Sequence, residues 1–162
     1  MNPERVFIGL GANLGDARGA IVQALAALAA LPHTRVVACS ALYRSAPVNA
    51  PGPDFINAVA ELRTALAPEP LLAALHAVEQ NHGRKRPFQN APRTLDLDLL
   101  VYGDRQIDDP VLTLKLPHPR LHLRAFVLLP LLELAPDLAP PGVGALHEWA
   151  QRAADQVIER LA

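Results

Sequence analysis

Two aspartates that lie one residue apart are the feature of this chain best suited to chemistry. Asp96 and Asp98 belong to the run PRTLDLDLLVY, residues 92–102. In a strand, alternation would place Leu95 and Leu97 on one face and both aspartates on the other. Paired carboxylates repel each other unless a cation lies between them, and hard divalent cations prefer such oxygens. The spacing therefore indicates a magnesium site.

Basic residues immediately precede the aspartates and extend this interpretation. Arg84, Lys85, Arg86 and Arg93 lie within a dozen residues upstream of Asp96. Guanidinium groups bind phosphate oxygens while carboxylates hold the metal, so the stretch predicts a magnesium nucleotide site. A structural alternative stays open, because alternate aspartates also occur on the solvated face of a half-buried sheet. Aspartate is depleted in strands, which favours the metal site.

Composition limits the kinds of protein that this chain can be. The 162 residues are 51% hydrophobic and carry a net charge of −1, which predicts a single domain over residues 1–162. The near-neutral charge argues against a surface that tracks nucleic acid, so the phosphate ligand should be small. Cys39 has no second cysteine to pair with. With no apolar signal or membrane-spanning stretch, we expect a cytoplasmic monomer without a membrane partner.

The elements that must position the aspartates follow a recognisable order. Periodicity predicts strands at 6–10, 34–45, 55–64 and 94–102, and helices at 17–31 and 68–81. The order βαββαβ predicts an α+β, ferredoxin-like antiparallel sheet with helices packed on it. Further along, we expect additional C-terminal helices at 123–134 and 145–161.

Two common nucleotide-binding motifs are excluded. Gly9-x-Gly11 begins like a dinucleotide fingerprint, but the third glycine, Gly15, comes one position late and the element order is not doubly wound. The sequence also contains no Gly-Lys-Ser or Gly-Lys-Thr, so a P-loop is absent. A nucleotide would have to bind at a site of another kind.

The longer motifs resemble those of one enzyme family. They are the runs at 9–15 (GLGANLG), 43–45 (YRS), 83–86 (GRKR), 92–100 (PRTLDLDLL), 117–120 (PHPR), 124–128 (RAFVL) and 131–136 (LLELAP). Together they resemble 6-hydroxymethyl-7,8-dihydropterin pyrophosphokinase, an enzyme of folate synthesis with a ferredoxin-like fold. The resemblance covers most of the chain.

The resemblance implies transfer of the β,γ-pyrophosphoryl group of ATP to the hydroxymethyl oxygen of the pterin, releasing AMP. Asp96 and Asp98 would hold two Mg²⁺ ions that bridge the triphosphate. The residues that match phosphate-contacting or nucleotide positions are Glu79, Arg84, Arg86, Arg93, His118 and Arg124. Of these, Arg84 and Arg93 would act in catalysis together with the two aspartates. The pattern departs from the family at His76, where glutamine is usual, and at 113–116, where residues are added.

The pterin is a flat ring with hydrogen-bonding edges, which requires aromatic faces and amide partners. The resemblance implies that Phe55 and Phe126 stack on the ring and that Asn57 binds its edge. The residues Ser45, Ala46 and Val48 match a loop that offers backbone groups to the pterin. From its spacing alone, Phe126 would be a core aromatic residue on an amphipathic helix.

Two other functions remain open at this point. Paired aspartates on a ferredoxin-like sheet also suit a two-metal enzyme that processes nucleic acid. A non-catalytic ferredoxin-like binding module would carry the same fold without chemistry.

Overall fold

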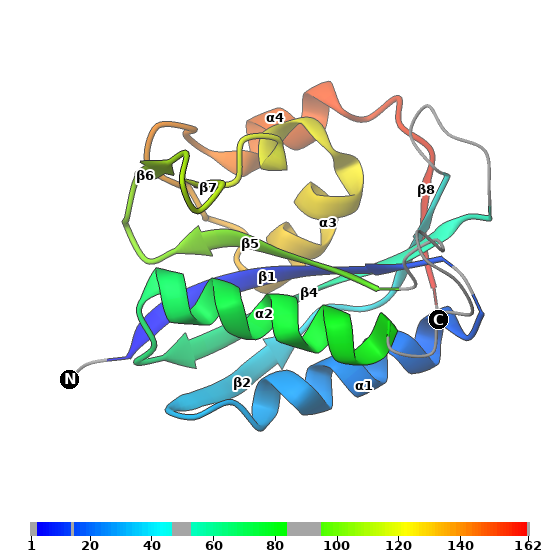
Figure 1. Cartoon of the computed structure of the whole chain (residues 1–162). Coiled ribbons are helices and arrows are strands. Elements are labelled where there is room, and N and C mark those ends of the chain that lie inside the picture. Colours follow the sequence, from blue (N-terminus) through cyan, green and yellow to red (C-terminus); the bar gives the residue numbers. More distant parts are fainter. Residues whose placement is uncertain (1–2, 14, 47–52, 84–94, 162) are drawn as a thin grey trace.

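The computed structural model describes residues 3–13, 15–46, 53–83 and 95–161, and Figure 1 shows how their elements are arranged. The strands are β1 (Glu4–Ala12), β2 (Thr34–Cys39), β3 (Tyr43–Ser45), β4 (Phe55–Thr64), β5 (Asp96–Tyr102), β6 (Ile107–Asp109), β7 (Leu114–Leu116) and β8 (Ile158–Arg160). The α-helices are α1 (Ala17–Ala29), α2 (Pro68–Gly83), α3 (Ala125–Leu134) and α4 (Leu146–Arg152), and a 3₁₀ turn spans Leu121–Leu123.

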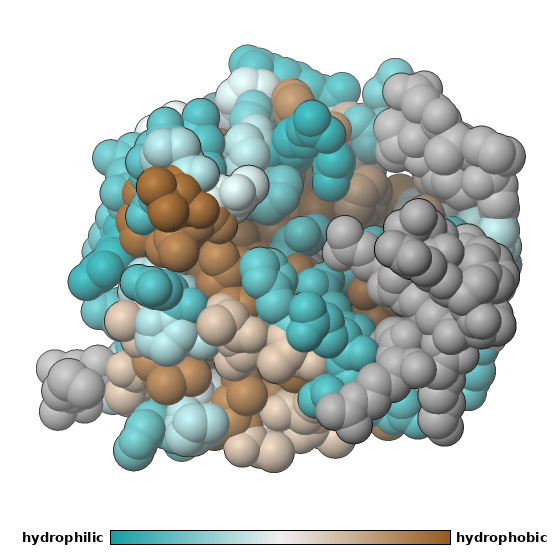
Figure 2. Space-filling view, in the orientation of Figure 1, coloured by the Kyte–Doolittle hydropathy of each residue, from teal (hydrophilic) through white to brown (hydrophobic). Residues whose placement is uncertain are grey.

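An antiparallel sheet forms the centre of the molecule. Its strand order is β5-β1-β4-β3-β8, and β2 also pairs with β4. The separate hairpin β6–β7 lies beside the end of β5 (Figure 1). In the view of Figure 2, apolar side chains gather over this hairpin, where Val111 of the connecting turn is 90% exposed.

Helices cover both faces of the sheet and divide the core in two. On one face, α1 and α2 bury residues such as Ile21 and Leu75 against Ile8 of β1. On the other face, α3 and α4 pack residues such as Leu128 against Phe7 (Figure 1). Strand alternation explains this division, because successive β1 side chains enter opposite cores.

The predicted strand at 34–45 is wrong as a single element. β2 ends at Cys39 and β3 begins at Tyr43. Between them, the Ser40 hydroxyl oxygen accepts the Val59 N–H at 2.9 Å, and Ser40 N–H donates to the Val59 carbonyl at 2.9 Å. A side chain therefore takes a backbone hydrogen bond that a continuous strand would make, which interrupts the ladder.

The predicted helix at 145–161 is also wrong in its second half. α4 ends at Arg152, and the chain then extends into β8, where Ile158 pairs with Ser45 of β3. Val157 and Ile158 are β-branched, which favours an extended chain, and β3 supplies backbone partners along its edge. The other predicted strands and helices are confirmed to within a few residues.

Candidate active site

The two aspartates share one face of β5, as the alternation predicts. Both are half-buried on that face, whereas Leu95 and Leu97 are buried on the other. In the β1–β5 register, Asp98 lies opposite Gly9 and Asp96 lies opposite Gly11. Because glycine has no side chain, the strand next to the carboxylates leaves space above the sheet.

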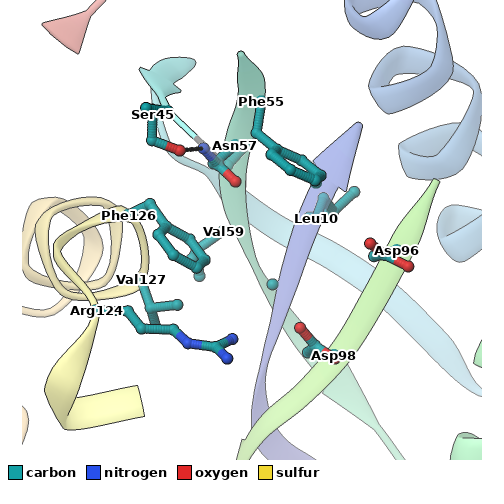
Figure 3. Close-up of a pocket in the computed structure, with 14 residues that line it drawn as sticks. Leu10, Ser45, Phe55, Asn57, Val59, Asp96, Asp98, Arg124, Phe126 and Val127 are labelled. Carbon is teal, nitrogen blue, oxygen red and sulfur yellow. Dashed lines mark hydrogen bonds between the residues drawn. The ribbon is translucent and has the colours of Figure 1, made fainter. Parts of the chain in front are cut away.

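A cavity of about 280 Å³ occupies this space. Its lining includes Ser45 of β3, Phe55 and Asn57 of β4, both aspartates, and Arg124 and Phe126 at the start of α3. Figure 3 shows the two phenyl rings on either side of the Asn57 side chain, with the aspartates across the cavity. The structure therefore brings the predicted stacking and edge residues together with the predicted metal ligands.

Asn57 is held in one orientation by its neighbours. It is 4% exposed, and its Nδ2 donates to Ser45 Oγ at 2.7 Å (Figure 3). Its Oδ1 lies 3.4 Å from the point that a Cβ on Gly11 would occupy. The carbonyl end of the amide is thereby directed over Gly11 and presents a hydrogen-bond acceptor to a ligand.

A second cavity, of about 630 Å³, adjoins the first. His76 of α2, Lys115 of the β6–β7 hairpin, and His118 contribute to its lining. Asp98 and Arg124 line both cavities. Figure 3 shows the Arg124 guanidinium and the Asp98 carboxylate directed toward the same space from opposite sides. Two ligands could thus meet at an acidic and a basic group.

The surroundings of His118 favour a neutral imidazole that donates a hydrogen bond from Nε2. Burial lowers its pKa below the ordinary 6.5, and Arg124 and Arg120 lower it further against the opposing effect of Asp98. Its Nδ1 accepts the Arg120 N–H at 3.1 Å. A neutral ring that accepts at Nδ1 carries its proton on Nε2, which can then donate to an anionic ligand.

Glu79, which matches a nucleotide position in the resemblance, contacts the strand that carries the aspartates. Its Oε2 accepts the Leu97 N–H at 2.8 Å, between the two aspartates on β5. Within the described part of the chain, Glu79 is not among the residues that line either cavity. The hydrogen bond from Leu97 to Glu79 holds β5, the strand that carries the two aspartates.

Val48, Arg84, Arg86 and Arg93 lie outside the described residues. The described residues do include Ala46, which lines the first cavity next to Ser45.

The donor set fits magnesium bound together with a phosphate ligand. Among the described residues, no group of three or more His, Cys, Asp or Glu side chains gathers as a metal site. Mg²⁺ is usually bound by one or two carboxylates, with substrate phosphates and water completing the octahedron. Among the described residues, Asp96 and Asp98 offer the pair of carboxylates that such a phosphate-dependent site uses.

Sequence reasoning missed the contribution of Gly9 and Gly11 to this site. In the sequence they begin a run like a dinucleotide motif, whereas in the structure they lie opposite the aspartates and leave room there. The shared spacing of two residues in Gly9-x-Gly11 and Asp96-x-Asp98 was the available signal, because paired strands keep equal spacing in register.

None of the described helices is long and apolar enough to cross a bilayer.

Comparison with known proteins identifies the family. The family model for 7,8-dihydro-6-hydroxymethylpterin-pyrophosphokinase (HPPK) matches residues 7–136. A Pseudomonas aeruginosa protein named 2-amino-4-hydroxy-6-hydroxymethyldihydropteridine pyrophosphokinase is 48% identical over 98% of this chain and 97% of its own length. The Haemophilus influenzae protein of the same name is 38% identical over 96% of each chain.

Solved structures agree at the level of the fold. A crystal structure of HPPK-DHPS in complex with substrates has a TM-score of 0.74 and 12% identity, and covers 94% of this chain. This chain spans only 43% of that longer protein. With the family match and these relatives together, the chain belongs to the 7,8-dihydro-6-hydroxymethylpterin-pyrophosphokinase family.

Proposed function

We propose that this chain transfers the β,γ-pyrophosphoryl group of ATP to the hydroxymethyl oxygen of 6-hydroxymethyl-7,8-dihydropterin, forming the pterin diphosphate and AMP. Family membership supports pyrophosphokinase activity in folate biosynthesis, and a matching Pneumocystis carinii protein is named folic acid synthesis protein fol1. The observation that carries the proposal is the meeting of two cavities at Asp98 and Arg124. A transfer between two bound substrates requires such a shared boundary.

The smaller cavity is the proposed pterin site. Phe55 and Phe126 would stack on the two faces of the ring, and Asn57 would bind its edge. Ser45 keeps the Asn57 amide oriented through their 2.7 Å hydrogen bond. Ala46 and Val48 would offer backbone groups to the ring. A flat ring between two phenyl groups gains both apolar burial and directed hydrogen bonds.

The larger cavity is the proposed ATP site. His118 would donate from Nε2 to a phosphate oxygen, and Arg124 would reach the phosphates at the boundary with the pterin site. Arg84, Arg86 and Arg93 would supply further positive charge, with Arg84 and Arg93 acting on the developing negative charge. Glu79 matches a family position near the nucleotide, and its hydrogen bond to the Leu97 N–H also holds β5.

Asp96 and Asp98 are the proposed ligands of two Mg²⁺ ions. When bound, these ions neutralise the triphosphate and align it for displacement at phosphorus. The protein's contribution is to hold both carboxylates on one face of a paired strand, opposite glycines that leave room for the ligand. Displacement at phosphorus needs such positioning and charge neutralisation more than covalent help.

The broader organisation is proposed as well. We propose that the sheet and its helices form a ferredoxin-like unit with additional C-terminal helices, and that residues 1–162 act as one domain. We expect a cytoplasmic monomer that acts on small molecules and does not bind nucleic acid. The two rival functions, a two-metal nucleic-acid enzyme and a non-catalytic binding module, gain no support from the relatives.

Product analysis tests the proposal directly. The protein is incubated with ATP, Mg²⁺ and 6-hydroxymethyl-7,8-dihydropterin, and nucleotides are separated by chromatography. AMP that forms only when the pterin is present is the expected product. ADP would indicate an ordinary kinase, and the absence of turnover by folded protein would return the binding module to consideration.

A further inference from the structure

The helix that carries two site residues begins without a cap of its own. Arg124 is the N-cap residue of α3, with an extended backbone (φ −119°, ψ 117°) and no side-chain cap hydrogen bond. The first N–H groups of a helix need acceptors, which Ser, Thr, Asp or Asn usually supply. An arginine side chain has only donors and cannot fill this role. The acceptor must come from elsewhere.

Gln156, in the segment after α4, supplies it. Its Oε1 accepts the Ala125 N–H at 2.9 Å, and its Nε2 donates to the Leu123 carbonyl at 2.8 Å. These two backbone groups belong to the residues on either side of Arg124. A single amide therefore holds the chain before and after the arginine, using both its donor and its acceptor.

Gln156 is itself anchored to the fold. Its backbone N–H donates to the carbonyl of Ala153 at 3.0 Å, and Ala153 is buried at the end of α4. Two residues further on, Ile158 pairs with Ser45. The segment 156–158 thus contacts the start of α3 on one side and β3 on the other.

These two contacts are made to two elements that line the proposed pterin site. The start of α3 carries Arg124 and Phe126, and β3 carries Ser45, the hydrogen-bond partner of Asn57. A neighbouring cavity of about 540 Å³ is lined by Gln156 and Ile158 together with Ser45 and Phe126, which places the segment directly behind the site. The segment therefore connects the start of α3 to β3 at the back of the site.

We propose that Gln156 is a positioning residue for the reaction: it fixes the first turn of α3 so that Arg124 and Phe126 face the Ser45–Asn57 wall. This inference rests on the proposed function of the cavity. Gln156 does not line the proposed pterin or ATP cavity, and acts through the backbone on either side of Arg124. Its loss shifts the groups that contact substrate without removing any of them.

The test compares Gln156→Met with Gln151→Met. Methionine keeps the length of the side chain but removes both hydrogen bonds. The control residue, Gln151, is exposed on α4, and its side chain makes no hydrogen bond to another described residue. For Gln156→Met we expect kcat/KM for the pterin to fall on the order of tenfold to a hundredfold, because small misplacements of orienting groups are costly. The KM for ATP should change less, and Gln151→Met should match the parent protein.

A second measurement does not depend on turnover. Hydrogen exchange of the Ala125 amide, followed by NMR or mass spectrometry, should be faster in Gln156→Met and unchanged in Gln151→Met. A Gln156→Glu variant keeps an acceptor for Ala125 but loses the donor to Leu123, so it should retain protection of Ala125 and recover part of the pterin KM. This variant also serves if the methionine variant fails to fold.

The possible results separate the positioning role of Gln156 from the proposed function of the protein. Wild-type values of kcat and pterin KM in Gln156→Met, or unchanged exchange at Ala125, would overturn the positioning role. Equal losses for ATP and pterin that follow a lowered melting temperature would reduce Gln156 to a structural residue and would also overturn it. If the parent protein forms no pterin-dependent AMP, the proposed function fails, while the exchange measurement still decides whether Gln156 holds the turn.

Discussion

Gly11 and Asn57 lie directly opposite each other on β1 and β4, and a Cβ on Gly11 would come within 3.4 Å of Asn57 Oδ1. The same point would be 3.9 Å from Cδ1 of Phe55. The missing side chain is therefore part of the shape of the proposed pterin site. The strand itself does not require this glycine, because Gly11 has no left-handed φ.

Gly11→Ala should weaken pterin binding without unfolding the protein. The added methyl group would occupy space beside the Asn57 carbonyl, so we expect the pterin KM to rise about tenfold or more, as for one methyl group too many in a fitted pocket. Steady-state kinetics with each substrate varied in turn would measure this. Gly9→Ala places its methyl 3.4–3.6 Å from the Leu100 side chain instead. Gly9 lines the same cavity, so Gly9→Ala should raise the pterin KM as well. An unchanged pterin KM in Gly11→Ala would contradict the role given to Gly11.

Asp98→Asn should abolish most of the magnesium-dependent turnover. The amide keeps the shape of the side chain but removes the charge that would hold the metal, so kcat should fall on the order of a hundredfold or more. Mg²⁺ titration in the presence of a nonhydrolysable ATP analogue would show the matching loss of binding. Asp104→Asn, at an exposed turn position, is the control and should behave like the parent protein. Unchanged kcat in Asp98→Asn would remove the carboxylate from the mechanism.

His118 should titrate below its ordinary value. Burial and two nearby arginines lower its pKa below 6.5 despite Asp98. An NMR titration of the imidazole signals would measure the midpoint, and His118→Gln would assign the signal by removing it. The unfolded chain takes up this proton first, so the contribution of His118 to folding stability should decline as pH falls below about 6.5. A midpoint at or above 6.5 would contradict the described environment.

Tyr43→Phe should destabilise the fold at neutral pH and less so at high pH. The Tyr43 hydroxyl donates to Glu133 Oε1 at 2.7 Å, and burial followed by this hydrogen bond raises the pKa of Tyr43 to about 12. Losing a hydrogen bond to a charged group costs about 1.5–3 kcal/mol. An unfolded tyrosine ionises near pH 10, so the stability from Tyr43 is complete below about pH 10 and declines as pH rises through 12.

Denaturant unfolding of both proteins at several pH values would measure this difference. A double-mutant cycle with Glu133→Gln isolates the Tyr43–Glu133 contribution from other effects of the substitutions. A difference between the parent protein and Tyr43→Phe that stays constant from pH 8 to the alkaline limit of folding would contradict the raised pKa of Tyr43.

Local patterns predicted the elements whose own sequence determines them. The alternation of Asp96 and Asp98 with leucines set the face of β5, and the apolar period of residues 17–31 marked α1. The break at Ser40 could not be predicted in this way, because it depends on hydrogen bonds to Val59 on a strand that follows later in the sequence. β8 likewise exists because β3 offers it a pairing edge.

Prediction of the site from the sequence has the same limit, because some of its contacts join distant parts of the chain. Resemblance named the side chains that line the cavities, but the contact of Gln156 with the backbone around Arg124 joins residues more than thirty positions apart. The Glu79 contact with Leu97 is similar, because the two residues belong to different elements and the sequence alone does not show that they meet. Such partners become visible only when the elements are packed together.

The glycines opposite the aspartates also restrict how the substrate range of this enzyme could be altered. Gly9 and Gly11 already have the smallest possible side chain, so every replacement in that part of β1 adds atoms to the cavity. Acceptance of a bulkier ring system must therefore come from other residues that line the cavity, for example by shortening Val59 on β4 or Val127 on α3. Laboratory evolution toward larger pterin analogues should collect substitutions at those positions and leave the glycines intact.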